Sequence, residues 1–302
     1  MTSASYHTSV IAVPPLARQA DGSVCAVQNT RLIRHIESGG VRILLYGGNA
    51  NFYHLRPSEF GSTLDMLAAA AGPETEVVPS VGPSYGVMMD QAEIVRDHNF
   101  RTVMVLPHTS LNTPDGVATG LRHFAEKAGR PIVVYMKQEN YLTPTLAAEL
   151  VKDGIVSWIK YAIVRQDPGK DAVLSELVQL VDPAMVVSGI GEQPALVHLD
   201  QFKLGGFTTG CGCVAPLLSQ KVLALARSGD WVGANQVRKQ FEPLEDLRNE
   251  INPVRVLHEA VTLSGIADMG TILPLLSGLN PVDRSKVQAA ATELLAQNTH
   301  PG

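Results

Sequence analysis

Short hydrophobic runs recur along the chain and alternate with longer segments in which apolar residues return every three or four positions. The short runs are rich in β-branched residues and are typical of buried strands, whereas the longer segments are typical of amphipathic helices. Strands are predicted over residues 8–13, 41–47, 76–81, 102–106, 132–136, 155–162, 184–190 and 206–209. Helices between them are predicted over residues 29–38, 58–71, 86–98, 117–128, 144–152, 171–181 and 194–203.

Eight strands that alternate with helices over about 215 residues predict an α/β fold of the closed (β/α)8 type, a TIM barrel. An open doubly wound sheet is the alternative, but no Gly-x-Gly-x-x-Gly motif follows the first strand. After the last strand, helices without intervening strands are predicted over residues 217–228, 234–252, 253–264 and 281–296. We therefore expect a barrel domain over residues 1–222 and a C-terminal helical domain over residues 223–302.

Composition excludes several classes of function. The chain has 302 residues, 45% of them hydrophobic, and a net charge of −5 without a basic run, which argues against nucleic acid and membrane partners. Neither a signal peptide nor a membrane span is recognised, and three cysteines are too few for a disulfide framework, so we expect a cytoplasmic protein. Cys211 and Cys213 have no histidine nearby, so no metal site is predicted.

The predicted strand over residues 155–162 is apolar on both faces and ends on Lys160. Such a strand belongs to a parallel sheet that helices cover, and lysine is rare in that setting. Burial disfavours the ammonium form and leaves a free amine that attacks carbonyls to form Schiff bases. The alternative is a lysine at the strand end that reaches water or pairs with a carboxylate.

Active sites of TIM barrels lie at the C-terminal ends of the strands. Tyr135 stands near the end of the strand that precedes the lysine strand, and neighbouring strands lie about 5 Å apart. A phenol beside the Lys160 amine is suited to carrying protons during imine formation. Alternatively, Tyr135 is a core tyrosine with a backbone partner.

The glycine-rich segment over residues 47–51 follows the second strand and offers backbone N–H groups to a substrate carboxylate. It is equally typical of a turn that needs glycine. We expect other strand ends to contribute as well, with Ser188, Glu192 and Thr208 facing the distal hydroxyls of a substrate. The candidate substrate-binding residues are Gly48, Asn49, Asn51, Thr109, Ser188, Glu192 and Thr208.

Two motifs, Pro131-Ile132-Val133-Val134-Tyr135 and Ile155-Val156-Ser157-Trp158-Ile159-Lys160, resemble those of the dihydrodipicolinate synthase / N-acetylneuraminate lyase family. The resemblance extends over residues 8–295. It implies that Lys160 is the Schiff-base lysine, that Tyr135 is the general acid/base, and that residues 47–51 bind the carboxylate of a 2-oxo acid. It also implies a homotetramer or homodimer without a cofactor, whose substrate is pyruvate or a 2-oxo acid derived from a sugar acid.

Departures from the family pattern narrow the predicted function. Gly48-Asn49 replaces the Thr-Thr or Ser-Thr pair of synthases and neuraminate lyases, His108-Thr109 replaces an aromatic pair, and residues 136–140 lack the synthase arginine. Residues 47–55 and 134–143 are most similar to the 5-dehydro-4-deoxyglucarate dehydratase branch. We predict a Schiff-base lyase, either a dehydratase or an aldolase, acting on a keto-deoxy sugar acid. The alternatives are a dihydrodipicolinate synthase or pyruvate aldolase, and a catalytically inactive barrel that binds an oxo acid.

Overall fold

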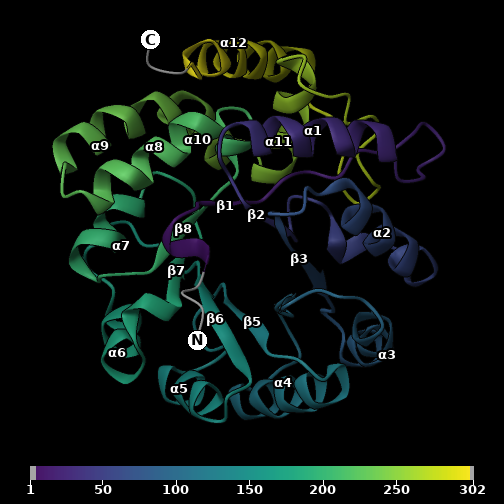
Figure 1. Cartoon of the computed structure of the whole chain (residues 1–302), viewed down its shortest axis with the longest axis vertical. Coiled ribbons are helices and arrows are strands. Elements are labelled where there is room, and N and C mark those ends of the chain that lie inside the picture. Colours follow the sequence, from purple (N-terminus) through teal and green to yellow (C-terminus); the bar gives the residue numbers. More distant parts are fainter. Residues whose placement is uncertain (1–4, 300–302) are drawn as a thin grey trace.

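The computed structural model describes residues 5–299, so the outermost residues of the two expected domains, 1–4 and 300–302, lie outside the described part. Eight parallel strands pair in chain order and close into a barrel (Figure 1). The strands are β1 (Ile11–Ala12), β2 (Ile43–Tyr46), β3 (Glu76–Val81), β4 (Val103–Val105), β5 (Ile132–Met136), β6 (Val156–Tyr161), β7 (Val186–Ser188) and β8 (Gly206–Thr209). The prediction of a TIM barrel is therefore confirmed.

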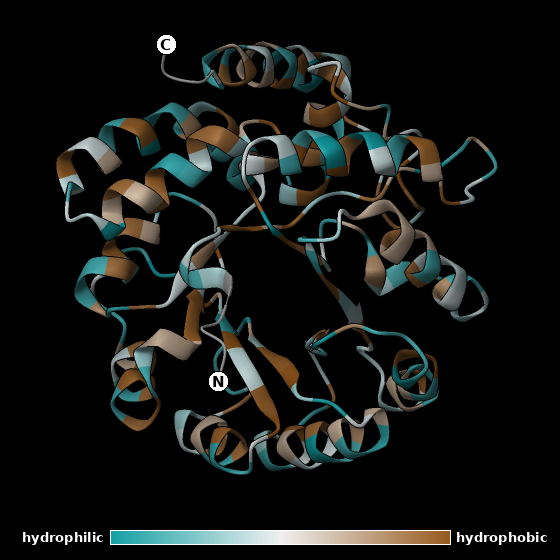
Figure 2. Ribbon diagram, viewed as in Figure 1, coloured by the Kyte–Doolittle hydropathy of each residue, from teal (hydrophilic) through white to brown (hydrophobic). Residues whose placement is uncertain are grey.

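A helix follows each strand and packs on the outside of the barrel (Figure 1). These helices are α1 (Ala26–Ser38), α2 (Pro57–Ala70), α3 (Tyr85–Arg96), α4 (Pro114–Ala128), α5 (Pro144–Lys152), α6 (Ala172–Leu180), α7 (Ala195–Gln201) and α8 (Pro216–Arg227). Figure 2 shows hydrophobic and hydrophilic residues interleaved along these helices, and the residues that a helix buries belong to the core, as Leu32, Ile33 and Ile36 of α1 do. Both faces of each strand are thus covered, as parallel sheets require.

The C-terminal helices α9 (Trp231–Arg238), α10 (Glu242–Glu250), α11 (Pro253–Leu263) and α12 (Pro281–Gln297) gather on one flank of the barrel (Figure 1). The single helix expected over residues 234–252 is instead divided into α9 and α10 by a 3-10 turn at Lys239–Phe241. Pro243 lies in the first turn of α10 and has no N–H with which to continue the preceding helix. The break redirects α10 toward the ends of β7 and β8.

A 3-10 turn at Ser5–His7 lies at the end of the barrel at which the strands begin. The ring of Tyr6 lies 5.9 Å from that of Trp158, centroid to centroid. Gly206 allows this approach, since a Cβ there would lie 2.7 Å from the carbonyl oxygen of Tyr6. The opposite end of the barrel, where the strands stop, is the end at which TIM barrels have their active sites.

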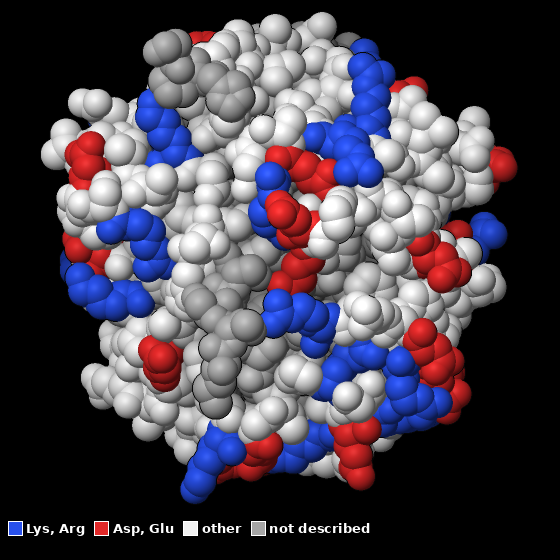
Figure 3. Space-filling view, viewed as in Figure 1, with Lys and Arg blue, Asp and Glu red and all other residues white. Residues whose placement is uncertain are grey.

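The visible surface is mixed in charge. Figure 3 shows acidic and basic side chains interspersed over one face of the molecule. Among residues 5–299, no helix is both long and apolar enough to cross a membrane.

Asp171 is a buried carboxylate that ties the end of β6 to the start of α6. The Tyr161 hydroxyl donates to it at 2.6 Å, and the backbone N–H of Leu174 donates at 3.0 Å. Burial alone raises the pKa of Asp171, but hydrogen bonds from Arg165 and Tyr161 outweigh burial and hold this pKa below its ordinary value. Because Tyr161 is fixed on the outer face of β6, the preceding residue, Lys160, is fixed on the inner face.

We expect Asp171→Ala to lower the free energy of unfolding by about 2–4 kcal/mol, measured by urea denaturation. The substitution leaves the buried Tyr161 hydroxyl without an acceptor, at a cost of about 1–3 kcal/mol, and removes a helix cap that contributes about 1 kcal/mol. Asp167→Ala, at an exposed carboxylate four residues earlier, is the control and should change stability by less than about 0.5 kcal/mol. Equal losses in the two variants would contradict the anchoring role.

Candidate active site

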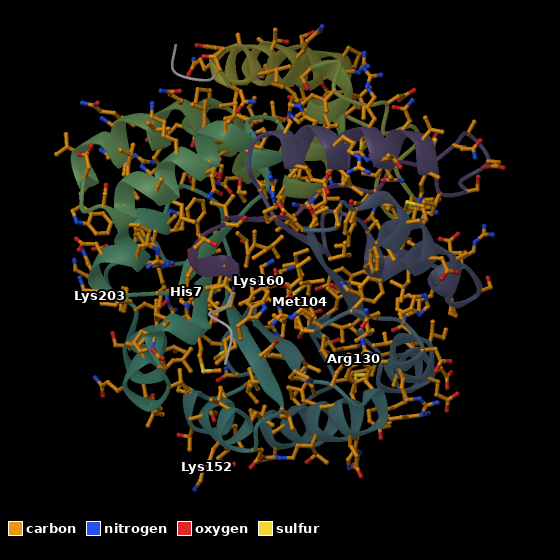
Figure 4. The ribbon with its side chains drawn as sticks, in the orientation of Figure 1. His7, Met104, Arg130, Lys152, Lys160 and Lys203 are labelled. Carbon is orange, nitrogen blue, oxygen red and sulfur yellow. The ribbon has the colours of Figure 1, made fainter. Side chains whose placement is uncertain are left out.

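Lys160 lies near the end of β6 with its side chain inside the ring of strands (Figure 4). Figure 4 shows Lys152 and Lys203, by contrast, at the outer edge of the molecule. The Lys160 side chain is 5% exposed, and no carboxylate in residues 5–299 lies within ion-pair distance of its amine. Burial lowers the pKa of Lys160 to about 7, with smaller contributions from the charges of Lys137 and Arg248. A neutral amine is therefore available on Lys160 at neutral pH.

Tyr135 on β5 is the direct register partner of Lys160 on β6. The amine nitrogen of Lys160 lies 4.3 Å from the centroid of the Tyr135 ring, over its face. Burial raises the pKa of Tyr135, with a smaller contribution from Tyr53, so its phenol remains protonated at neutral pH. The pair therefore combines a nucleophilic amine with a proton donor.

A cavity of about 230 Å³ surrounds the amine and brings several of the expected residues together. Among the predicted residues, its walls include Lys160, Tyr135, Gly48, Asn49 and Thr208. The side-chain amide of Asn49 donates to the carbonyl of Val13 at 2.8 Å, which fixes Asn49 against the end of the barrel. The cavity is smaller than the roughly 300–1,000 Å³ typical of drug-sized ligands and suits a small organic acid.

The other four predicted residues do not line this cavity. Asn51 closes the loop after β2, and its N–H donates to the carbonyl of Gly48 at 2.9 Å. Thr109 is exposed on the loop after β4. Ser188 is the register partner of Tyr161, so it points outward, and its hydroxyl lies 2.8 Å from Nδ1 of His198.

Glu192 is fully buried behind the cavity wall. Its carboxylate accepts hydrogen bonds from the hydroxyls of Thr209 and, at 2.8 Å, Ser219. Direct contact between substrate and any of these four residues stays a prediction.

The C-terminal helices supply cavity residues that the sequence did not single out. Arg248 and Asn249 at the end of α10 line the cavity, together with Pro253 and Val254 of α11. Gly210 leaves space for this arrangement, because a Cβ there would lie 2.6 Å from the guanidinium carbon of Arg248. One sequence feature could have drawn attention to α10: two charged residues, Glu245 and Arg248, lie three positions apart beside its apolar positions. This feature does not reveal that α10 packs against the end of the barrel.

Tyr53 is a second residue that the sequence did not single out. Its hydroxyl is buried and has no hydrogen-bond partner in the described part of the chain. A Cβ on Gly48 would lie 3.8 Å from its ring, and the amine of Lys137 lies 5.8 Å from the ring centroid. Burial raises the pKa of Tyr53 to about 12. A phenol thus lies beside the loop that lacks the serine and threonine hydroxyls of the related family.

A larger hollow of about 710 Å³ lies between α3 and α4. Its walls include Tyr85, Leu111 and Tyr141 but neither Lys160 nor Tyr135. Over residues 5–299, no group of three or more histidine, cysteine or acidic residues is arranged to hold a metal ion. The smaller cavity is therefore the candidate active site, because it alone of these two contains the perturbed amine.

Comparison with known sequences gives distant relatives. No family model matches the chain. A 4-hydroxy-tetrahydrodipicolinate synthase of Acidithiobacillus ferrooxidans is 26% identical over 269 residues, which cover 84% of this chain and 88% of the relative. A protein of Streptomyces coelicolor named "Probable 5-dehydro-4-deoxyglucarate dehydratase 1" is 23% identical over 146 residues, 47% of this chain and 46% of the relative.

Solved structures share the fold over nearly the whole chain. Dihydrodipicolinate synthase from Bacillus clausii superimposes with a TM-score of 0.84 at 21% identity, covering 96% of this chain and 97% of the other. The sialic acid aldolase of Ruminococcus gnavus gives 0.84 at 16% identity, covering 96% and 98%. YagE from Escherichia coli K12, solved in complex with pyruvate, gives 0.82 at 19% identity, covering 95% and 98%. In sequence the chain is therefore similar to enzymes of the lyase type, and its fold is that of the dihydrodipicolinate synthases and the sialic acid aldolase, the family that its motifs resemble.

Proposed function

We propose that this protein forms a Schiff base between Lys160 and a 2-oxo acid and then eliminates water from, or cleaves, the bound acid. The observation that carries the proposal is the Lys160 amine itself, which is buried, unpaired with a carboxylate and beside the Tyr135 phenol in a small cavity. An amine of this kind is a competent nucleophile at neutral pH.

The first step joins the Lys160 nitrogen to the C2 carbonyl carbon of the acid. The carbonyl oxygen takes a proton from Tyr135, and the resulting tyrosinate takes one back from the nitrogen, which gives a carbinolamine. Tyr135 then protonates the carbinolamine hydroxyl, which leaves as water while the nitrogen lone pair forms the protonated imine, so the phenol acts as acid and base in turn and ends as a tyrosinate. In this proposal Gly48 and Asn49, which line the cavity, hold the C1 carboxylate.

The protonated imine then withdraws electrons from C3. Transfer of a C3 proton to the tyrosinate of Tyr135 gives an enamine, and Tyr135 then passes that proton to the C4 hydroxyl, which leaves as water and completes a dehydration. Alternatively, the tyrosinate takes the proton of the C4 hydroxyl and the C3–C4 bond breaks, so that C4 leaves as an aldehyde and an enamine of pyruvate remains. Tyr135 then protonates this enamine at C3, which restores the imine. Hydrolysis of the imine, which reverses the steps of its formation, frees Lys160 in either case.

The second candidate is the cleavage or condensation reaction with pyruvate. It is favoured by the relative named as a 4-hydroxy-tetrahydrodipicolinate synthase and by the fold shared with YagE, whose structure contains pyruvate. Product analysis separates dehydration from cleavage, since dehydration releases no pyruvate and aldol cleavage does. The homotetramer or homodimer and the cytoplasmic location expected from the sequence stay predictions.

Borohydride reduction tests the imine directly. Reduction during incubation with pyruvate or another 2-oxo acid should add to the protein the mass of the acid less one oxygen atom, once per chain, at the peptide that contains Lys160. Lys160→Ala should abolish this adduct while the melting curve shows a folded protein, and Lys152→Ala, at an exposed helix end, should keep it. Absence of an adduct with every acid, or an adduct that persists without Lys160, would support the inactive barrel instead.

Tyr135→Phe removes the proton carrier and keeps the ring. We expect imine formation to slow by about a hundredfold or more, with little change in melting temperature, because general acid–base catalysis contributes at least that factor. Tyr85→Phe is the matched control, since the Tyr85 hydroxyl lies outside this cavity, 3.0 Å from Nδ1 of His123. A Tyr135→Phe enzyme that labels at the wild-type rate would show that the phenol only fills space.

The reactivity of Lys160 should follow its free-amine form. Acetylation at the Lys160 peptide, followed by mass spectrometry, should rise with pH to a half-maximum near 7, because the pKa of Lys160 is lowered to about that value. Lys137→Met should move this midpoint to higher pH, since removing a nearby positive charge makes the ammonium form less unfavourable. Lys152→Met should leave the midpoint in place, and an unmoved midpoint in Lys137→Met would contradict the coupling.

A further inference from the structure

The cavity around Lys160 carries positive charge without acidic residues in its walls. Three of its lining residues are basic, namely Lys137, Lys160 and Arg248, and none is aspartate or glutamate. Lys160 is the nucleophile in the proposed function, which uses its neutral form. Two cationic side chains, those of Lys137 and Arg248, therefore remain to attract negative charge on a ligand. A single carboxylate needs only one of them.

Arg248 reaches the cavity from outside the barrel, at the end of α10. Its Nε donates to the carbonyl of Pro253 at 3.3 Å, and one terminal nitrogen lies 3.9 Å from the sulfur of Cys211. No carboxylate in residues 5–299 lies within ion-pair distance of the guanidinium. Since a guanidinium has five N–H donors, most of its hydrogen-bonding capacity is left for a ligand.

Two buried carboxyl groups, those of Glu192 and Glu245, lie behind Arg248 and account for the position of α10. Oε1 of Glu245 accepts from the backbone N–H of Glu192 at 3.1 Å, and a Cβ on Gly191 would lie 2.2 Å from the same oxygen. Burial raises the pKa of both carboxyl groups, and the charge of Arg248 acts in the opposite direction. The pair thus fixes α10 against the end of β7 without neutralising the guanidinium through a direct ion pair.

We propose that Arg248 binds the distal carboxylate of a 2-oxo dicarboxylic acid whose C2 carbonyl reacts with Lys160. The inference rests on the proposed function and names its substrate class. Gly48 and Asn49, after β2, hold the carboxylate next to the carbonyl, and Arg248, beside the ends of β7 and β8, holds the other one. Guanidinium groups bind carboxylates in a two-pronged geometry that lysine does not match.

Matched acids test this inference on the wild-type protein. Borohydride labelling is titrated with 2-oxoglutarate and 2-oxopentanoate, which share a five-carbon chain and differ only in the distal carboxylate. The six-carbon pair 2-oxoadipate and 2-oxohexanoate covers a longer reach. We expect at least one diacid to reach half-maximal labelling at a concentration tenfold or more below that of its monoacid. Equal titrations within both pairs would overturn the inference.

Variants of Arg248 test whether this residue causes the preference for diacids over monoacids. Arg248→Gln should reduce the diacid preference to near unity, and Arg248→Lys should retain only part of it. Arg284→Gln makes the same charge change on the exposed surface of α12 and should keep the full preference. A full preference in Arg248→Gln would overturn the assignment to Arg248. If pyruvate labels Lys160 but neither pair shows a preference, only this inference fails, whereas the absence of any label at Lys160 removes the proposed function as well.

Discussion

Water stabilises an ammonium ion so strongly that its removal from water costs several kcal/mol unless a partner charge compensates. Lys160 has no such partner among residues 5–299, and burial lowers its pKa until the neutral amine is available. The residues around the amine are compatible with a neutral rather than a charged Lys160. The neighbouring wall is an aromatic face, no acidic residue lines the cavity, and the nearest charges, on Lys137 and Arg248, are positive. A single aspartate in the cavity wall would restore the ammonium form and remove the nucleophile.

The barrel holds the amine in place through the alternation of its strands. Lys160 points inward because Tyr161 points outward and is tied to Asp171, and helices cover the outer face. Tyr6 occupies the end at which the strands begin, and α10 partly covers the end at which they stop. The cavity around the Lys160 amine lies between these two ends. A reactive imine in such a place is protected from competing hydrolysis until the bound acid has reacted.

Sequence periodicity was sufficient to predict the strands and helices of the barrel, because each one buries a complete apolar face. It was also sufficient to place Tyr135 beside Lys160, since equivalent positions on consecutive parallel strands meet. It did not reveal the outward direction of Ser188, which depends on the register of β7 against β6. It also failed for Arg248, because the periodicity of α10 does not identify the barrel end as its neighbour. Tyr53 was overlooked for a similar reason, since only the folded loop brings its ring onto Gly48.

The positive residues in the cavity affect the reaction in two opposed ways. Before substrate binds, Lys137 and Arg248 favour the neutral amine, which is the form that attacks. The protonated imine that follows is itself a cation, and the same two residues would then disfavour it. In the proposed mechanism the substrate resolves this conflict, because its carboxylates enter with it and offset the positive charge exactly when the imine forms. A dicarboxylate offsets more of that charge than a monocarboxylate does. Charge balance along the reaction, and not only binding of the free acid, therefore favours a substrate with two carboxylates.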